Sequence, residues 1–369
     1  MVLAMPSDLQ SAPVLLTGFP GFLSDHLLRE LATRTEGELH LLCLPSMVKR
    51  GERRLSALQE EHQELKGRWQ IHGGDITRRH LGLAEKVYGE LKKKIGVVWH
   101  LAAIYDLAVG REVAYEVNVG GTQRVLEFCE AAEGLGRLNY VSTCYVSGER
   151  RGVILEEELD RGQGHKNAYE ETKFWAEVEV QRRAEESGIP TAIFRPGITV
   201  GHSQTGEVNK YDGPYYVFRL LHRLPEWMPF PNVGQGDAVV NLVPIDFVAR
   251  AMGVLGHADG AEGVFHLADP TPMRAQEIVD AVLKHLGRSP TVGSLPASWV
   301  ERALRNSVVK GWTGVPVEAL AYFNHDARYD TERSQEALER HGVRCPPLPT
   351  YLDRLLDYYL MHPEGPPGV

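Results

Sequence analysis

Short apolar runs alternate with stretches of helical spacing along the first 270 residues of the chain. A continuous apolar run of a few residues is typical of a parallel strand buried on both faces. Between the runs, apolar residues recur three or four positions apart, as on one face of a helix. Strands that alternate with helices predict an α/β fold with a doubly wound parallel sheet. The expected strands are residues 13–16, 38–44, 68–76, 96–103, 138–143, 191–197 and 263–268.

The pattern changes after Gly201, where a polar, glycine-rich stretch is followed by the aromatic segment 215–231. This segment favours an apolar lid or pocket wall over a core helix; the alternative is the core of a smaller domain. Helical spacing returns near residue 245, over 276–286, from 297 and over 350–361. We expect one domain over residues 1–201, to which 240–270 return, and a smaller, mainly helical C-terminal substrate-binding region over 202–369.

Composition narrows the class of protein. The 369 residues are 43% hydrophobic and 24% charged, which is typical of a globular protein. A net charge of −9 disfavours nucleic-acid binding. The four cysteines are scattered without CxxC spacing, so we expect a reducing compartment and no structural metal. No run reaches the roughly 18 apolar residues of a membrane span, and residues 1–11 lack a signal-peptide pattern. A cytoplasmic protein is expected.

A glycine turn joins the first predicted strand to a helix. Thr17 to Leu23 reads TGFPGFL, and the helix spacing starts near Ser24. Gly18 permits a tight turn, Gly21 allows backbone to approach a pyrophosphate, and the helix amides attract the anion. Ser24 stands where a third glycine is usual. This unit predicts dinucleotide binding; the alternative is an ordinary turn.

The end of the second strand bears on the choice of dinucleotide. Domains that select NAD usually carry a carboxylate here to bind the ribose 2′-hydroxyl. In this chain Leu44 is followed by Pro-Ser-Met-Val and then by cations. The cations suit a 2′-phosphate and so predict NADP(H); the alternative is a solvated basic helix start. They are Lys49, Arg50, Arg53 and Arg54.

Two further strand ends could contact a dinucleotide. Asp75 could accept a hydrogen bond from the adenine amino group while the Ile76 amide donates one; Asp75 could also cap a helix that starts at Thr77. Ala102 and Ala103 leave room for a ligand after the fourth strand. His100 is expected to be structural.

Tyr169 and Lys173 are four residues apart on an expected helix, so they share a face. A nearby ammonium group favours the phenolate and would lower the tyrosine pKa from its ordinary value near 10. The phenol could then exchange a proton with a substrate oxygen near neutral pH. Thr143, at the end of the fifth strand, could hydrogen-bond the same oxygen.

With these motifs in order, the chain resembles the extended short-chain dehydrogenases/reductases over residues 12–270, a family with a Rossmann sheet. Within that superfamily it is similar to the fatty acyl-CoA reductase and carrier-protein thioester reductase branch. The superfamily resemblance rests on TGFPGFL at 17–23, GDI at 74–76, HLAA at 100–103, NVGGT at 118–122, VST at 141–143, Tyr169 to Lys173, and RPG at 195–197. The branch resemblance rests on 99–107, 172–177, and 195–197 running into 203–206.

The resemblance implies that Thr143, Tyr169 and Lys173 are catalytic. It implies an apolar or acyl substrate delivered as a separate molecule, on coenzyme A or a carrier protein. Many extended members pair through the helices after strands four and five, so a homodimer is expected. The residues expected along the cofactor are Thr17, Gly18, Phe19, Pro20, Gly21, Phe22, Leu23, Lys49, Arg50, Arg53, Asp75, Ile76, Leu101, Ala102, Ala103, Asn118, Tyr169, Lys173, Pro196 and Gly197.

The leading hypothesis is an NADPH-dependent reductase of a carbonyl or thioester on a largely apolar substrate. One alternative is a hydroxysteroid or alcohol dehydrogenase, which would use the same residues in reverse. A nucleotide-sugar epimerase or dehydratase is disfavoured because the second strand lacks an acidic end. A regulator that binds a dinucleotide without catalysis is disfavoured by the intact Thr143, Tyr169 and Lys173 set.

Overall fold

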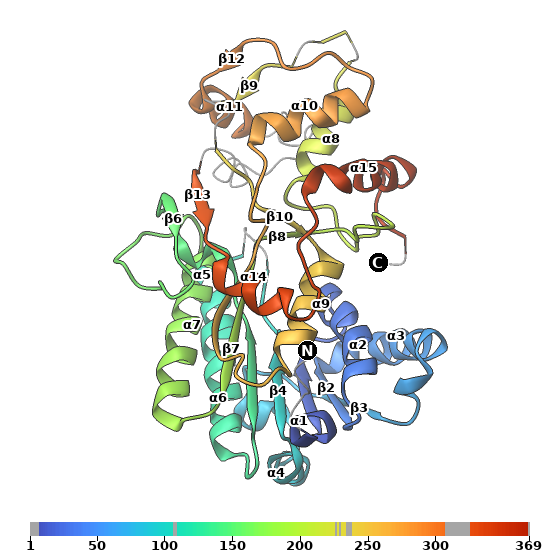
Figure 1. Ribbon diagram of the computed structural model, residues 1–369, viewed down its shortest axis with the longest axis vertical. Coiled ribbons are helices and arrows are strands. Elements are labelled where there is room, and N and C mark those ends of the chain that lie inside the picture. Colours follow the sequence, from blue (N-terminus) through green and yellow to red (C-terminus); the bar gives the residue numbers. More distant parts are fainter. Residues whose placement is uncertain are drawn as a thin grey trace.

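The computed structural model describes residues 7–105, 109–225, 227–228, 230–233, 238–306 and 325–367. Within them, seven parallel strands form one sheet in the order β11-β7-β5-β4-β1-β2-β3 (Figure 1). The order runs outward from β1 in both directions, which confirms the predicted doubly wound Rossmann sheet. The strands are β1 (Val14–Thr17), β2 (Leu39–Cys43), β3 (Trp69–Gly73), β4 (Val97–His100), β5 (Arg137–Val141), β7 (Thr191–Pro196) and β11 (Gly263–Leu267).

Both faces of the sheet are covered because the strands are apolar on both sides. Successive residues of a strand point to opposite faces, and β1 shows the consequence: Val14 and Leu16 belong to one buried cluster and Leu15 to another. The first cluster packs under α2 (Phe22–Arg34), α3 (Val48–Glu61), α9 (Ile245–Leu255) and α14 (Glu332–Glu339). The second packs under α4 (Glu85–Lys94), α6 (Gly121–Ala131) and α7 (Ala168–Ser187).

A third apolar cluster lies beyond the carboxyl ends of the strands, in the upper part of Figure 1. It joins α8 (Tyr215–Arg223), α10 (Ala275–His285) and α15 (Leu352–Met361). Strands β8 (Ile198–Val200) and β10 (Leu242–Pro244) pair beneath it. The other elements are β9 (Asn232–Val233) paired with β12 (Ser294–Leu295), α11 (Ala297–Leu304), β6 (Gly152–Ile154) paired with β13 (Ala327–Tyr329), α1 (Ser7–Ser11) and α5 (Arg111–Tyr115).

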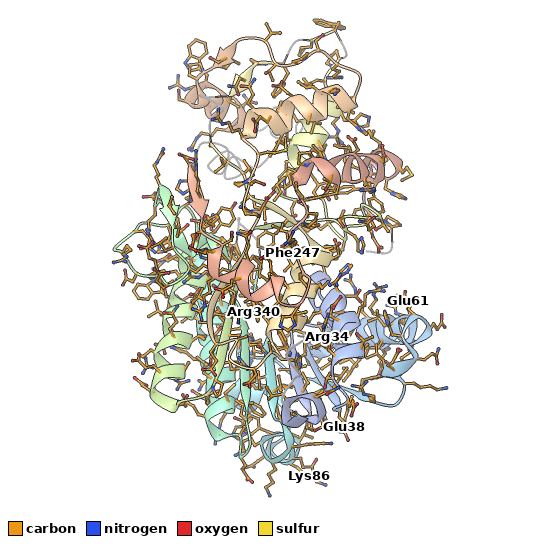
Figure 2. All side chains as sticks on the ribbon, viewed as in Figure 1. Arg34, Glu38, Glu61, Lys86, Phe247 and Arg340 are labelled. Carbon is orange, nitrogen blue, oxygen red and sulfur yellow. The ribbon has the colours of Figure 1, made fainter. Side chains whose placement is uncertain are left out.

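The chain crosses between the seven-stranded sheet and the third apolar cluster more often than the sequence predicted. Besides the expected return of residues 240–270, α14 packs against α9 and β11, and its Leu338 is buried in the first cluster. Charged side chains such as Glu38 and Lys86 project from the surface, whereas Phe247 is enclosed (Figure 2). Among the described helices, none combines the length and the apolar character that crossing a bilayer requires.

Candidate active site

The glycine turn lies against the end of β4. Gly18 has φ +88°, and a Cβ there would lie 2.8 Å from the Ala102 backbone nitrogen, so only glycine fits. The Thr17 hydroxyl, just before the turn, accepts N–H groups from Leu101 (3.2 Å) and Ala102 (3.1 Å). Helix α2 starts at Phe22, so its first amides face the turn. The structure thus brings together the expected residues 17–23 and 101–102.

Ser24 closes this turn. Its hydroxyl oxygen accepts the Gly21 N–H (2.9 Å) and lies 3.0 Å from the Gly18 carbonyl, to which it can donate. Ser24 is 1% exposed. The serine at the usual glycine position therefore holds the turn in shape, a role that the sequence pattern did not reveal.

Asp75 caps the turn that follows β3. Its Oδ1 accepts the Thr77 N–H (2.9 Å) and the Thr77 hydroxyl (2.8 Å). The helix expected from Thr77 is instead a short 3₁₀ turn over Arg79–Gly82; in it His80 and Leu81 have positive φ, which a continuing α-helix does not allow. Ile76 is 7% exposed and lies against Gly121.

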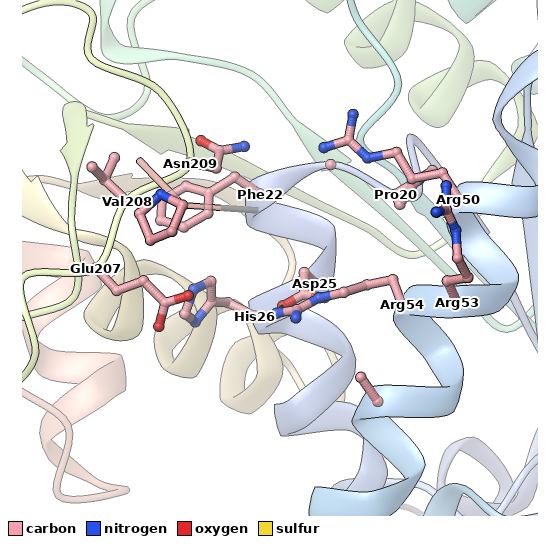
Figure 3. A pocket seen from close by; sticks show the side chains of 13 residues that line it. Pro20, Phe22, Asp25, His26, Arg50, Arg53, Arg54, Glu207, Val208 and Asn209 are labelled. Carbon is pink, nitrogen blue, oxygen red and sulfur yellow. Dashed lines mark hydrogen bonds and ion pairs between the residues drawn. The ribbon is translucent and has the colours of Figure 1, made fainter. Parts of the chain in front are cut away.

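The expected cations divide between a cavity and an ion pair. A cavity of ≈ 600 Å³ lies between α2, α3 and residues 207–209, and Arg50 and Arg53 line it beside the glycine turn (Figure 3). Arg54 also lines it but donates to the Asp25 carboxylate at 2.5 and 2.7 Å. No ion pair joins Arg50 or Arg53 to a carboxylate within the described chain. Lys49 is exposed and does not line the cavity.

The predicted catalytic residues meet at the end of β5. The Asn167 side chain caps α7 by accepting the Glu170 N–H at 3.0 Å, and this starts the helix just before Tyr169. Thr143 follows β5, and its side chain is hydrogen-bonded to Tyr169. The ring of Tyr105 meets the Tyr169 ring edge-on, with centroids 5.0 Å apart. Tyr105 is 47% exposed and is a candidate wall of the site; it belongs to the 99–107 stretch of the branch resemblance, which assigned it no role.

The prediction that Lys173 lowers the pKa of Tyr169 is wrong. Burial raises the pKa of Tyr169, and the hydrogen bond from Thr143 offsets this only in part. Lys173 does not lower it, because its ammonium group donates to the Tyr140 hydroxyl (2.8 Å) and the Val141 carbonyl (2.7 Å). Burial lowers the pKa of Lys173 to about 7, against a weaker opposing effect of Glu177.

Asn118 lies in the helical turn Glu116–Gly120, directly before α6, and holds two segments of the site together. Its amide oxygen accepts the Ile104 N–H (2.8 Å), and its amide nitrogen donates to the Thr172 hydroxyl (3.0 Å). These bonds tie the segment after β4, including Ala103, to α7. Pro196 ends β7, and a Cβ on Gly197 would lie 2.7 Å from the Asn241 side chain.

The aromatic segment 215–231 is not a lid throughout, which corrects the expectation. Tyr215, Phe218 and Leu221 are at most 1% exposed in the third cluster, because α8 turns one apolar face onto α10 and α15. Trp227 is 79% exposed. Glu226 and Pro229 lie outside the described residues, as do Asp106 and Leu107 of the branch motif.

Tyr140 is the functional candidate that sequence reasoning missed. It lies on β5 and is 1% exposed. In the sequence it is one aromatic residue in an apolar strand, which is typical of a core position. That its hydroxyl lies beside Lys173 could only be inferred once β5 and α7 were known to be neighbours, so no local sequence signal indicated it.

Comparisons with known proteins show the family of the chain. A profile described as male sterility protein, an NAD-binding domain, matches residues 16–252, more than half of the chain. Glycine betaine reductase ATRR of Emericella nidulans is 31% identical over 304 residues, 78% of this chain and 23% of that protein. The L-2-aminoadipate reductase large subunit of Eremothecium gossypii is 28% identical over 272 residues, 67% of this chain and 19% of that protein. The chain thus spans less than a quarter of these relatives.

Solved structures share the fold across nearly the whole chain. The terminal R domain of the myxalamid PKS-NRPS biosynthetic pathway superposes with a TM-score of 0.79 at 24% identity, covering 97% of this chain and 95% of that one. A thiolation-reductase di-domain from an archaeal non-ribosomal peptide synthetase gives a TM-score of 0.75 at 21% identity, with 96% and 76% covered. The chain belongs to the male sterility protein family within the extended short-chain dehydrogenases/reductases, and it is an oxidoreductase that binds a nicotinamide dinucleotide.

Proposed function

We propose that the chain is an NADPH-dependent reductase of acyl thioesters, with Tyr169 as the proton donor. The observation that carries the proposal is the convergence of Thr143, Tyr169 and Lys173 at the end of β5. This is the edge at which ligands bind in open α/β sheets, and the glycine turn of β1 lies at the same edge.

The cofactor fits the residues present. Gly18 leaves no space for a side chain against β4, so backbone alone faces a dinucleotide there. The first amides of α2 would hold the pyrophosphate. Arg50 and Arg53 would hold a 2′-phosphate in the cavity, which supports NADPH over NADH. When bound, the reduced nicotinamide supplies a hydride to the substrate carbonyl carbon.

Tyr169 would supply the proton. Because burial raises its pKa, the hydroxyl keeps its proton at neutral pH. A thioester oxygen becomes a strongly basic alkoxide as the carbonyl carbon is reduced, and the Tyr169 hydroxyl can then protonate it. The Thr143 hydroxyl, hydrogen-bonded to Tyr169, would orient the same oxygen. Loss of the thiol then leaves an aldehyde.

The relatives support the substrate class. Two curated relatives are named as reductases of glycine betaine and of L-2-aminoadipate, both carboxylic acids. A thiolation-reductase di-domain shares the fold. We therefore propose that the acyl group arrives as a thioester on a carrier protein or on coenzyme A. The aromatic rings of Tyr105 and Tyr169 favour an acyl group with an apolar portion.

The test is reduction of a series of acyl-pantetheine and acyl-coenzyme A thioesters by the purified chain. We expect NADPH oxidation with release of one free thiol per aldehyde formed. Tyr169→Phe should abolish turnover and leave NADPH affinity nearly unchanged, because only the transferable proton is lost. Full activity in Tyr169→Phe would contradict the mechanism. Oxidation of alcohols with NADP⁺ and no thioester turnover would favour the alcohol dehydrogenase alternative.

A further inference from the structure

A buried chain of hydrogen bonds links the proposed catalytic lysine to the glycine turn. Lys173 Nζ donates to Tyr140 Oη at 2.8 Å. The Tyr140 hydroxyl is hydrogen-bonded to Thr122, whose Oγ1 lies 3.0 Å from His100 Nε2. His100 Nδ1 lies 2.8 Å from Thr17 Oγ1, directly before the turn. All five side chains are at most 3% exposed.

The partners fix the direction of each hydrogen bond. Thr17 Oγ1 accepts two backbone N–H groups, so its own proton goes to His100 Nδ1. His100 then carries its proton on Nε2 and donates to Thr122, which donates to the Asn118 carbonyl at 2.6 Å. The Tyr140 hydroxyl therefore donates to Thr122 and presents its lone pairs to Lys173.

Two members of this hydrogen-bonded network, His100 and Tyr140, keep fixed protonation states. Burial lowers the pKa of His100 to about 3 and raises that of Tyr140 well above its ordinary value. Both therefore stay neutral at working pH. The titratable groups that interact with Lys173 are Tyr140 on β5, His100 on β4 and Glu177 on α7. Glu177 is held by Arg195 of β7 at 2.5 Å and is not free to move toward the lysine.

We propose that Tyr140 is a positioning residue, which holds the Lys173 ammonium group at the end of β5, one helical turn along α7 from Tyr169. The inference rests on the proposed function. A tyrosine that served only to fill the core would need no polar partner beyond Thr122. Here the same oxygen also accepts from Lys173, and the lysine lies over the ring at 4.3 Å from its centroid.

The experiment compares Tyr140→Phe with Tyr88→Phe, which removes the same atom from another tyrosine of the second apolar cluster. The first readout is the titration of the Lys173 side chain, followed by NMR of lysine labelled with ¹³C and ¹⁵N, in the full chain without substrate. Losing the Tyr140 hydroxyl keeps the ring beneath the ammonium group but leaves the Val141 carbonyl as its one described hydrogen-bond acceptor, so the Lys173 midpoint should fall by about one pH unit or more. Tyr88→Phe should not move it.

The second readout is the pH dependence of kcat for thioester reduction. The rate should fall as pH rises through the Lys173 midpoint, so Tyr140→Phe should shift this alkaline limb to lower pH and reduce kcat about tenfold at neutral pH. If Tyr140→Phe folds poorly, Thr122→Val, which frees the Tyr140 hydroxyl, should shift both readouts in the same direction.

An unchanged Lys173 midpoint in Tyr140→Phe would overturn the proposal, even if the protein lost activity or stability. Conversely, a shifted midpoint in a chain that reduces no thioester would retain the positioning role and reject the proposed function. The NMR titration therefore separates the two failures.

Discussion

At the scale of single residues, the site depends on hydroxyl groups held by their neighbours. Thr17, Thr122, Thr143 and Ser24 each bond to backbone or to another side chain within the site. Roles for Thr143, Tyr169 and Lys173 could be predicted from their types and spacing. The contacts of Ser24 and Tyr140 could not, because they depend on the turn geometry and on strand β5 lying beside α7.

Lys173→Ala should impair both chemistry and cofactor binding, whereas Tyr169→Phe should impair chemistry alone. The reason is that, by the family resemblance, Lys173 is part of the catalytic set and also holds the nicotinamide ribose. Isothermal titration with NADPH and steady-state kinetics separate the two effects. Equal NADPH affinity in both variants would remove Lys173 from the cofactor site.

At the scale of elements, all seven strands of the sheet were predicted from the sequence. The central strands β1, β2 and β4 are buried along their whole length and are apolar runs, whereas the edge strand β3 (WQIHG) is only partly buried. The aromatic segment at α8 was harder. Its apolar face could be read from the spacing, but the sequence did not show whether that face lines a pocket or packs in a core, which the packing of α10 and α15 decides. The cations at the start of α3 could be read from the sequence. The sequence did not show that one of them, Arg54, forms an ion pair with Asp25.

The α3 arginines should set cofactor preference. Arg50→Ala combined with Arg53→Ala should lower kcat/KM for NADPH at least tenfold (~1.5 kcal/mol) with little change for NADH, since a phosphate would lose charge-assisted hydrogen bonds. Lys49→Ala, which alters the same helix start outside the cavity, should have a smaller effect. A wild-type ratio of the two kcat/KM values in the double variant would place the phosphate elsewhere.

Side chains of the aromatic segment 215–231 should differ in how much they contribute to stability, because some lie in the core and others on the surface. Phe218→Ala should lower the free energy of unfolding by roughly 3–5 kcal/mol, because it leaves a cavity in the third cluster. Trp227→Ala should change it by less than about 0.5 kcal/mol, since this side chain is 79% exposed. Denaturant unfolding of both variants tests this. If Trp227 lines the substrate cleft, Trp227→Ala should also raise KM for long acyl chains while stability stays unchanged.

At the scale of the whole molecule, buried histidines are expected to lower the stability of the fold at acidic pH. Burial lowers the pKa of His257 and His40 to about 4 and that of His100 and His266 to about 3. In the unfolded chain a histidine has a pKa near 6.5, so below that pH the unfolded state binds more protons. Stability is therefore complete above pH 6.5 and is lost as pH falls toward 4.

Thermal unfolding between pH 8 and pH 4.5 checks this. The Tm should be flat above about pH 7 and fall steeply below 6.5, with each fully buried histidine contributing roughly 1–2 kcal/mol by pH 5. His257→Gln should make the decline shallower, because it removes one buried histidine whose pKa is lowered. A Tm that does not change down to pH 4.5 would contradict the buried neutral state of these side chains.

The repeated crossing of the chain between the sheet and the third apolar cluster limits how the protein can be divided for engineering. Residues 242–267 and 327–343 return to the sheet after the chain has already built part of the region above it. No single junction can therefore detach one part from the other. A chimera that exchanges substrate-recognition regions between relatives would need several coordinated splice points, and a cut at residue 201 would leave β7 without β11, its neighbour at the edge of the sheet.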